Sequence, residues 1–432
     1  MIIEFTVENF RSIKDEQIFS LYTTDSEKSH LSENMVRNPF PGDFSLLKSV
    51  GVYGANASGK SNLLKAFYAF QWIAVRSKKL DDGDSIPLYK PYRLSEVSRE
   101  APTIFELEFV IPENGRFSYR VSFTQKHVVE EKLVCYRSAK EAVLFERTKS
   151  DTWETIQFGN LYKGGKKQFP FFANQSYLSV AGSSADAPEL IRDVYTFIRK
   201  EIVHLDVDEE YDYFPNEENR FLIEHISQLI AFADTGICGV KLQKRDMDAT
   251  KIRFRSNMSL SMQKKILERE GQEYRFLHET DAGKTESFEQ KDESTGTNKL
   301  FMLSPLLFDA LMTGGVLIID ELDNSMHPFM AELIIKLFND PEVNPFGAQL
   351  IFSTHNINLM SPDLMRRDQI WFAEKEKGAT RIYSLDAFDK KVVTPTSPFN
   401  RWYAEGRLGA VPHIDYMSIV KLFKKGEPNA KA

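Results

Sequence analysis

The sequence predicts an α/β fold, and three features of the chain lead to this prediction. An apolar stretch at residues 46–53 is followed by a glycine-bearing turn at 54–61 and then by a helical pattern. The runs Val316–Ile319 and 349–352 are predominantly apolar without alternation, which is typical of strands buried on both faces of a parallel sheet. Residues 103–123 instead alternate around a turn that contains Pro and Gly, which predicts an antiparallel hairpin beside that sheet.

Length and composition exclude several classes of protein. The 432 residues allow two or three structural units. With 62 acidic and 55 basic side chains the formal charge is −7, so the net charge gives no support to nucleic-acid binding, and any such contact must be local. The two cysteines, Cys135 and Cys238, are too few for a disulfide framework, and we expect both to be buried. No apolar stretch approaches the roughly 18 residues of a membrane span, so we expect a cytoplasmic protein without membrane contact.

The order of the predicted elements suggests a head made from the two ends of the chain. Residues 1–186 contain an N-terminal strand at 2–10, the turn at 54–61 and the hairpin. Apolar residues then recur at helical spacing, so we expect a mainly helical insertion at 187–285, although the charged stretch after residue 244 supports no assignment of its own. Residues 286–432 supply the second part of the head, with a helix near 330–338 between two buried strands.

The turn at 54–61 matches the phosphate-binding pattern G-x-x-x-x-G-K-S and lies between a strand and a helix, as that motif requires. The residues that we expect to surround the phosphates are Gly54, Ala55, Asn56, Ala57, Ser58, Gly59, Lys60, Ser61 and the following Asn62. Glycines let the backbone wrap around phosphate, and the helix N-terminus presents free N–H groups. Lys60 can reach the β- and γ-phosphates of ATP, and Ser61 can ligate Mg²⁺.

Two further strand ends carry polar residues that fit the same chemistry. Asp320 and Glu321 follow the run Val316–Ile319, at the sheet edge where open α/β sheets bind ligands. Asp320 can hold Mg²⁺ through water, and Glu321 can orient and polarise the attacking water. His355 follows the next apolar run and can hydrogen-bond the γ-phosphate. Taken singly, an Asp-Glu pair is an ordinary surface feature and a histidine is an ordinary structural residue; their expected position on one edge favours the functional interpretation.

The combination of motifs resembles the head of the ABC-type ATPases, specifically the SMC/RecF-like branch. The phosphate loop is followed by the Ser-x-Gly-containing turn 293–297, then by the acidic strand end 320–328 and by Ser353, Thr354 and His355. Within the branch these motifs, the opening residues 9–13 and the closing residues 401–412 look most like bacterial ATPases related to the OLD (overcoming lysogenization defect) proteins and to abortive-infection phage-defence ATPases.

This resemblance implies a mechanism in which two heads sandwich two ATP molecules, so we expect a homo-oligomer. The resemblance places each nucleotide between the phosphate loop of one subunit and the turn of the other, which contains Ser294, Thr295, Gly296 and Thr297. Glu321 becomes the catalytic base, and Asp320 and Ser61 the ligands of Mg²⁺. Asp323 makes a contact across the interface, and His355 senses the γ-phosphate. Arg11 and Ser12 approach the nucleotide from the N-terminal strand.

The chain also departs from this pattern. Neither Gln71 nor Gln125 can be assigned to a glutamine loop. The central segment lacks the heptads and the length of SMC coiled-coil arms. No Toprim-type acidic cluster follows His355, so we expect a nucleotide-gated regulator or scaffold in anti-phage defence whose effector, a toxin or nuclease, is encoded separately.

Other functions stay open at this stage. A GTPase is disfavoured because Asn298-Lys299 is followed by Leu300 and Phe301, without the carboxylate that guanine recognition needs. An ATPase of DNA repair or DNA processing is an alternative, as is a scaffold that binds nucleotide without hydrolysing it. The lysines that could contact nucleic-acid phosphate in the DNA alternative are Lys163, Lys166, Lys167, Lys421, Lys424 and Lys425.

Overall fold

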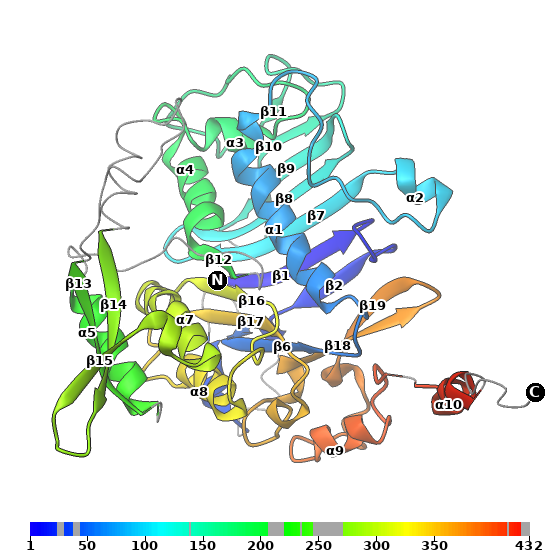
Figure 1. Cartoon of the computed structure of the whole chain (residues 1–432). Helices are drawn as coiled ribbons and strands as arrows, with labels where there is room; N and C mark the ends of the chain where they lie inside the picture. The colour runs from blue at the N-terminus through cyan, green and yellow to red at the C-terminus, as the bar shows by residue number, and fades with distance from the viewer. Residues whose placement is uncertain are drawn as a thin grey trace, which may run out of the picture.

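The computed structural model describes residues 1–23, 30–37, 44–137, 140–205, 220–233, 236–244, 271–412 and 414–424. In this part of the chain two large sheets, one mostly parallel and one antiparallel, lie on either side of helix α1 (Lys60–Arg76) (Figure 1). The predicted α/β fold with an antiparallel subdomain is therefore confirmed. No helix within the described ranges is both long and apolar enough to span a membrane.

The parallel sheet carries the strand ends that form the candidate site. Its strand order is β12 (Ile202–Leu205), β16 (Val316–Ile319), β17 (Gln349–Ser353), β6 (Ser49–Tyr53), β18 (Ile370–Glu376) and β19 (Ala379–Ser384). The first five strands are parallel, and β19 runs antiparallel to β18. Every residue of β6, β16 and β17 is buried, as expected for strands covered on both faces. Strands β6 and β17 pack tightly at Gly51, where an added Cβ atom would lie 2.7 Å from the Phe352 ring.

The antiparallel sheet packs its apolar face on the opposite side of α1. Its strand order is β11 (Gln157–Phe158), β10 (Glu141–Thr148), β9 (Val128–Tyr136), β8 (Gly115–Phe123), β7 (Thr103–Ile111), β1 (Ile2–Glu8) and β2 (Gln17–Ser20). Strands β7 and β8 form the predicted hairpin. Phe67 of α1 stacks on Phe5 with 3.9 Å between ring centroids, and Phe5 stacks in turn on Phe105. These aromatic contacts therefore fix α1, and with it the turn at its N-terminus, against the antiparallel sheet.

One predicted strand divides into two. The stretch 46–53 forms β5 (Ser45–Leu47), which pairs with β3 (Tyr22–Thr23) and β4 (Met35–Arg37), and then β6 of the parallel sheet. Lys48 marks the division because its N–H donates to Asn34 O while its carbonyl accepts from Leu350 N. The prediction of a single strand is wrong because apolarity alone does not reveal which partner each half will pair with.

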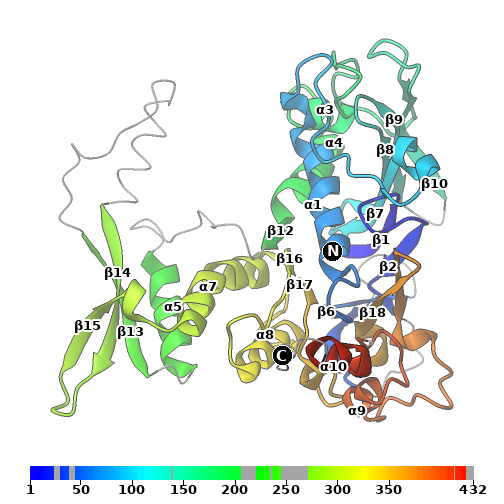
Figure 2. The same ribbon diagram turned by 45° about the vertical axis from the view of Figure 1, so that its right-hand side comes forward.

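In the residues that the structure describes, the central segment 187–285 combines helices with strands. Helix α4 (Glu189–Thr196) and the π-helical turn η4 (Phe197–Glu201) pack beside α1, and β12 joins the parallel sheet. Beyond them, α5 (Arg220–Phe232) packs with three antiparallel strands, β13 (Ile237–Lys244), β14 (Gln272–Glu279) and β15 (Thr285–Glu289). This small lobe projects from the head at the N-terminal end of α7 (Thr295–Thr313) (Figure 2). Its strands escape a search for helical periodicity because they are rich in polar residues and only partly buried.

The remaining helices lie around this frame. They are α2 (Glu96–Glu100), α3 (Tyr177–Ala181), α8 (Pro328–Asn339), α9 (Phe399–Ala404) and α10 (Tyr416–Lys424). Helices α7 and α8 share an apolar core with strands of the parallel sheet. Cys135 is buried as expected, but Cys238 is exposed. The expectation for Cys238 is wrong because β13 has a bulge between Ile237 and Gly239, which turns the side chain outward.

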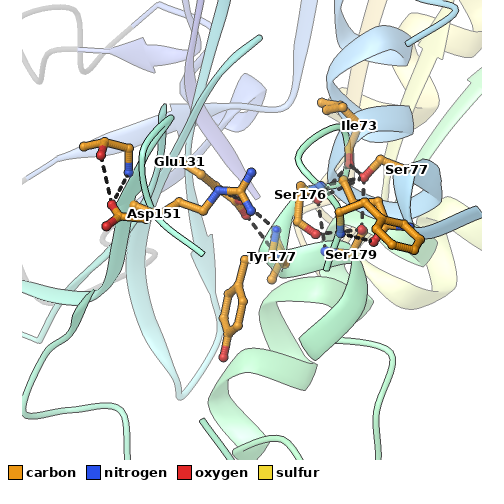
Figure 3. A network of polar contacts seen from close by, with 12 residues as sticks. Ile73, Ser77, Glu131, Asp151, Ser176, Tyr177 and Ser179 are labelled. Carbon is orange, nitrogen blue, oxygen red and sulfur yellow. Dashed lines mark hydrogen bonds and ion pairs between the residues drawn. The ribbon is translucent and has the colours of Figure 1, made fainter. Parts of the chain in front are cut away.

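Buried polar contacts join α1, α3 and the antiparallel sheet (Figure 3). The fully buried Glu131 carboxylate accepts hydrogen bonds from the N–H groups of Tyr177 and Leu178, at 2.7 and 2.9 Å, and so caps the start of α3. It also accepts from the Tyr119 hydroxyl at 2.9 Å and pairs with the buried Arg147 at 3.5 Å. Burial lowers the pKa of Arg147, and the Glu131 charge opposes this effect. The network holds the antiparallel sheet against the helices.

Candidate nucleotide-binding site

The phosphate-binding turn leaves β6 at Tyr53 and enters α1 at Lys60, as the motif predicts. Gly54 and Gly59 have φ of 151° and 113°, a region that side chains strongly disfavour. A Cβ atom on Gly54 would lie 2.3 Å from Ala373 O, and one on Gly59 would lie 2.1 Å from Thr380 Oγ1. Both glycines are therefore required by the conformation of the turn and by its close contact with β18 and β19.

Lys60 lies inside the turn. Its ammonium group donates to Gly54 O at 2.8 Å and to Ala55 O at 3.1 Å. Burial lowers the pKa of Lys60, and the nearby carboxylates of the acidic strand end oppose this effect. Within the same turn the hydroxyl of Ser58 is buried and has no hydrogen-bond partner among the residues that the structure describes. A confined cation and an unpartnered hydroxyl in a turn rich in N–H groups fit a bound phosphate chain.

A chain of hydroxyl groups connects the N-terminal segment to this turn. Asn62 Nδ2 donates to Ser12 Oγ at 2.6 Å, and Ser12 Oγ lies 2.7 Å from Thr380 Oγ1. Thr380 Oγ1 donates to Ser58 O at 2.8 Å, so the Ser12 hydroxyl donates to Thr380. The structure thus places Ser12 and Asn62 at the site. Arg11 differs: its exposed side chain lies over the Phe10 ring, and its N–H donates to Lys90 O, so within the described residues it makes no contact with the turn.

The acidic strand end is held by the neighbouring strand. Ser353, the last residue of β17, donates from Oγ to Asp320 Oδ1 at 2.5 Å and accepts from the Glu321 N–H at 2.8 Å. Glu321 has a φ of 52°, a left-handed conformation that costs about 1–2 kcal/mol for a residue with a side chain. Its side chain is half-buried. The bridge orients the Asp320 carboxylate and holds the backbone of Glu321 next to it.

The next carboxylate, Asp323, is fixed in a similar way. Thr354 Oγ1 donates to Asp323 Oδ1 at 2.5 Å. Lys299 of α7 donates from Nζ to Glu321 O at 3.0 Å and to Asn324 O at 2.8 Å, so its ammonium group bridges two carbonyls of the segment that follows β16. Burial lowers the pKa of Lys299, and Asp323, Glu321 and Asp320 oppose this effect.

His355 follows β17 on the same edge as Lys60 and the carboxylates. Burial lowers the pKa of its imidazole, and the positive charge of Lys60 lowers it further, against the opposing effect of Asp323, Glu321 and Asp320. The ring is therefore neutral at pH 7 and can donate or accept a hydrogen bond. The ends of β6, β16 and β17 converge as the sequence predicts, because Lys60, His355 and the acidic residues lie within electrostatic reach of one another.

The Ser294 turn lies apart from the phosphate-binding turn of the same chain. Ser294 caps α7, whose first residues are Thr295 and Gly296. Its Oγ atom accepts a hydrogen bond from the Thr297 N–H at 3.1 Å and lies 2.8 Å from Thr297 Oγ1. A Cβ atom on Gly296 would lie 2.9 Å from Ser325 O. Gly296 therefore lies close to the segment after β16, and in the described ranges no hydrogen bond joins these four residues to residues 54–61.

The closing motif at residues 401–412 lies against the phosphate-binding turn. Ala55 N donates to Ala410 O at 3.0 Å, and the Tyr403 hydroxyl donates to the same carbonyl at 2.9 Å. The Tyr383 hydroxyl fixes the neighbouring Leu408 O at 3.0 Å. The motif therefore supports the first residues of the turn from outside.

Several residues of the site escaped the sequence analysis. Ser353 and Thr354 were noticed only as neighbours of His355, although their position after a buried strand is a usable signal. Thr380 and Ala410 gave no signal, because they lie more than 300 residues from the turn that they contact. The sequence analysis considered Lys299 only as part of a possible guanine-binding motif. In the structure its ammonium group donates to the carbonyls of Glu321 and Asn324.

The residues suit a nucleoside triphosphate with its Mg²⁺. In the described part of the chain no group of three or more His, Cys, Asp or Glu side chains could hold a metal ion by itself. Mg²⁺ in phosphoryl-transfer sites is typically bound by one or two protein oxygens together with substrate phosphates. Ser61 and Asp320 are the residues that would supply those protein oxygens.

The fold and the site define a P-loop NTPase with an α/β core. The chain belongs to the P-loop ATPase family described as "AAA domain, putative AbiEii toxin, Type IV TA system", whose sequence model matches residues 49–361. No curated protein matches the sequence.

The solved structures that match this chain share little sequence with it. An SMC head bound to the C-winged helix domain of ScpA has 12% identity and a TM-score of 0.46, covering 91% of this chain and 99% of that one. The SMC head domain of Thermotoga maritima has 13% identity and a TM-score of 0.38, with 89% and 98% covered. The recombination mediator protein RecF-ATPrS of the RecFOR pathway has 11% identity and a TM-score of 0.36, with 88% and 98% covered.

Proposed function

We propose that this protein is an ABC-type ATPase that binds and hydrolyses ATP with Mg²⁺ and pairs its heads around the nucleotide. The observation that carries the proposal is the Ser353 bridge, which orients the Asp320 carboxylate and holds the backbone of Glu321 within electrostatic reach of Lys60. Hydrolysis of a phosphoanhydride needs charge stabilisation and an oriented water rather than a covalent intermediate. An oriented carboxylate, the carboxylate of the next residue and a confined lysine suit both tasks.

Each residue has a task in this proposal. Lys60 exchanges its two carbonyl partners for the β- and γ-phosphates, and the N–H groups of the turn bind the remaining phosphate oxygens. Ser61 and Asp320 hold Mg²⁺, which supplies positive charge to the phosphates when bound. Glu321 orients the attacking water and accepts its proton. His355, neutral in the free protein, donates a hydrogen bond to the γ-phosphate.

Pairing of two heads completes the proposed site. Ser294, Thr295, Gly296 and Thr297 are placed away from the same chain's phosphate-binding turn, at the exposed start of α7. The free N–H groups of a helix N-terminus attract phosphate, so this turn can bind the γ-phosphate held by a second copy. Asp323, oriented by Thr354, is available for a contact across the same interface. ATP then acts as a switch for assembly.

A biological role follows from the family. A family described as a toxin of a type IV toxin–antitoxin system implies a cognate partner, and we infer that ATP-dependent pairing of heads controls a separately encoded effector, a toxin or nuclease, in bacterial anti-phage defence. This assignment to defence rests on family analogy rather than on the chemistry of the site.

The test combines turnover with assembly. ATP hydrolysis is measured against protein concentration, and sedimentation is measured for Glu321→Gln with and without ATP and Mg²⁺. Rising specific activity and ATP-dependent association of Glu321→Gln are expected, whereas Lys60→Ala should neither bind ATP nor associate. Glu332→Gln, a half-buried carboxylate on α8, is the matched control and should behave as the wild type.

The opposite outcomes are equally informative. Turnover that is independent of concentration, with no effect of ATP on assembly, would contradict the shared site. ATP-dependent association without measurable turnover in the wild type would identify a scaffold that binds nucleotide and does not hydrolyse it.

A further inference from the structure

A polar cavity lies at the C-terminal end of α1, whereas the phosphate-binding turn lies at its N-terminal end. It has a volume of about 520 Å³, within the range of about 300–1,000 Å³ that is usual for ligand sites. Lys60 begins α1 and Arg76 ends it, so the helix rise separates the two sites by about 24 Å. The cavity is therefore distinct from the nucleotide site. Helix α1 lies beside α4 here in both views (Figures 1 and 2).

Four cationic side chains surround this cavity. They are Arg76, Lys78, Lys79 and Arg199, joined by Gln71, Val75 and Tyr195. All four cations are exposed, while Tyr195 is 5% exposed and forms a buried aromatic wall. Such a concentration of positive charge is unusual in a chain whose formal charge is −7.

The cations lack acidic partners among the residues that the structure describes, where no ion pair involves any of the four. The pKa of Lys78 is lowered by burial and then by the positive charges of Arg199 and Lys79. Lys78 Nζ lies 5.8 Å from the centroid of the Tyr195 ring and makes a weak cation–π contact with it. An anion in the cavity would relieve this repulsion.

The walls of the cavity are fixed before any ligand arrives. Gln71 Nε2 donates to Ile198 O at 2.8 Å and to Ile202 O at 2.7 Å, which ties α1 to η4 and β12. Arg199 therefore faces the cations at the end of α1 from a separate, anchored element. The C-terminal dipole of α1 accounts for a cation at Arg76, but not for Arg199, which comes from η4.

We propose that this cavity binds a ligand carrying two or more phosphate groups, either a free polyphosphate or nucleotide or the phosphorylated end of a nucleic-acid strand. Several cations on two elements suit multiple phosphate groups better than one carboxylate, because each phosphate accepts hydrogen bonds from more than one donor. This proposal does not depend on the proposed ATPase function.

The experiment measures binding of three probes to the full chain. The probes are inorganic tripolyphosphate, a short single-stranded oligonucleotide with a 5′-phosphate, and the same oligonucleotide without it. The proteins are the wild type, Lys60→Ala, the double variant Lys78→Gln/Arg199→Gln and a matched control, Lys149→Gln/Lys284→Gln, which removes two exposed lysines outside the cavity. Thermal unfolding verifies that all four are folded.

Because tripolyphosphate can also bind at Lys60, the cavity variant and the control pair are compared in the Lys60→Ala background. There, at least one phosphorylated probe is expected to bind Lys60→Ala and the control within twofold of each other, and Lys78→Gln/Arg199→Gln at least tenfold more weakly. Binding of tripolyphosphate alone identifies a free polyphosphate or nucleotide as the ligand. Preference for the 5′-phosphorylated oligonucleotide identifies a strand end. An equal loss in the control pair, equal binding of both oligonucleotides without tripolyphosphate binding, or no binding of any probe by Lys60→Ala would overturn the proposal.

Discussion

The hydroxyl of Ser353 donates to Asp320 Oδ1 at 2.5 Å, and this contact joins the ends of two adjacent parallel strands. The same oxygen accepts from the N–H of Glu321. One small side chain thus sets the direction of the proposed metal-binding carboxylate and the backbone of the proposed base. Residues that orient ligands in this way typically affect metal affinity or activity by 10- to 100-fold.

Replacing Ser353 with Ala should lower ATP turnover by about 10- to 100-fold and raise the Mg²⁺ concentration needed for half-maximal activity. The free energy of unfolding should fall by only about 1 kcal/mol, because one hydrogen-bonding group is lost. Turnover at graded Mg²⁺ and denaturant unfolding measure the two effects. Ser304→Ala, which removes a buried hydroxyl bonded to Leu300 O, should cost similar stability and leave Mg²⁺ dependence unchanged.

Replacing Thr380 with Val should weaken ATP binding about fivefold, because it removes the hydroxyl that joins Ser12 to Ser58 O. Binding of a fluorescent ATP analogue measures the change. Thr103→Val, a fully buried threonine whose hydroxyl donates to Asn9 O, is the control and should leave affinity unchanged. Equal affinity for wild type and Thr380→Val would show that the hydroxyl chain does not shape the turn.

ATP binding should be accompanied by proton uptake at His355. In the free protein burial and Lys60 hold the pKa of this histidine below its ordinary value, and a γ-phosphate beside the ring would raise it. Between these two pKa values the complex binds more protons than the free protein, so uptake should be largest there and should fade as the pH rises above the pKa of the complex. Calorimetry in two buffers with different ionisation enthalpies measures it.

The control for this prediction is another half-buried histidine, His127. His355→Asn should abolish the uptake, whereas His127→Asn should retain it. Uptake that persists in His355→Asn would place the titrating group elsewhere.

Replacing Glu131 with Gln should lower the free energy of unfolding by about 3–5 kcal/mol, because it leaves the buried Arg147 without a countercharge. Glu130→Gln, on the same strand but more exposed, should change it by less than about 1 kcal/mol. The double variant Glu131→Gln/Arg147→Met should be more stable than Glu131→Gln alone, as measured by urea unfolding. If the two variants are equally unstable, the ion pair does not account for the loss.

The local features of the site could be predicted from the sequence because each depends on a short stretch of chain. The phosphate-binding turn is specified by its own glycines and by Lys60, and the acidic pair and His355 each directly follow an apolar run. Parallel strands bring such ends to one edge, so their convergence was also predictable. The cap at Ser294 was readable for the same reason.

The remaining features were decided by contacts between distant parts of the chain. Thr380 and Ala410 meet the turn only because β18 lies next to β6 and the closing motif folds back on it. Likewise, Arg199 faces Lys78 only because Gln71 ties η4 to α1. The sequence by itself determined the α/β class and the chemistry of each strand end, since these follow from local pattern and periodicity. Only the tertiary structure decided which residues hold those ends in place, because hydrogen-bond partners separated by hundreds of residues leave no mark in local sequence.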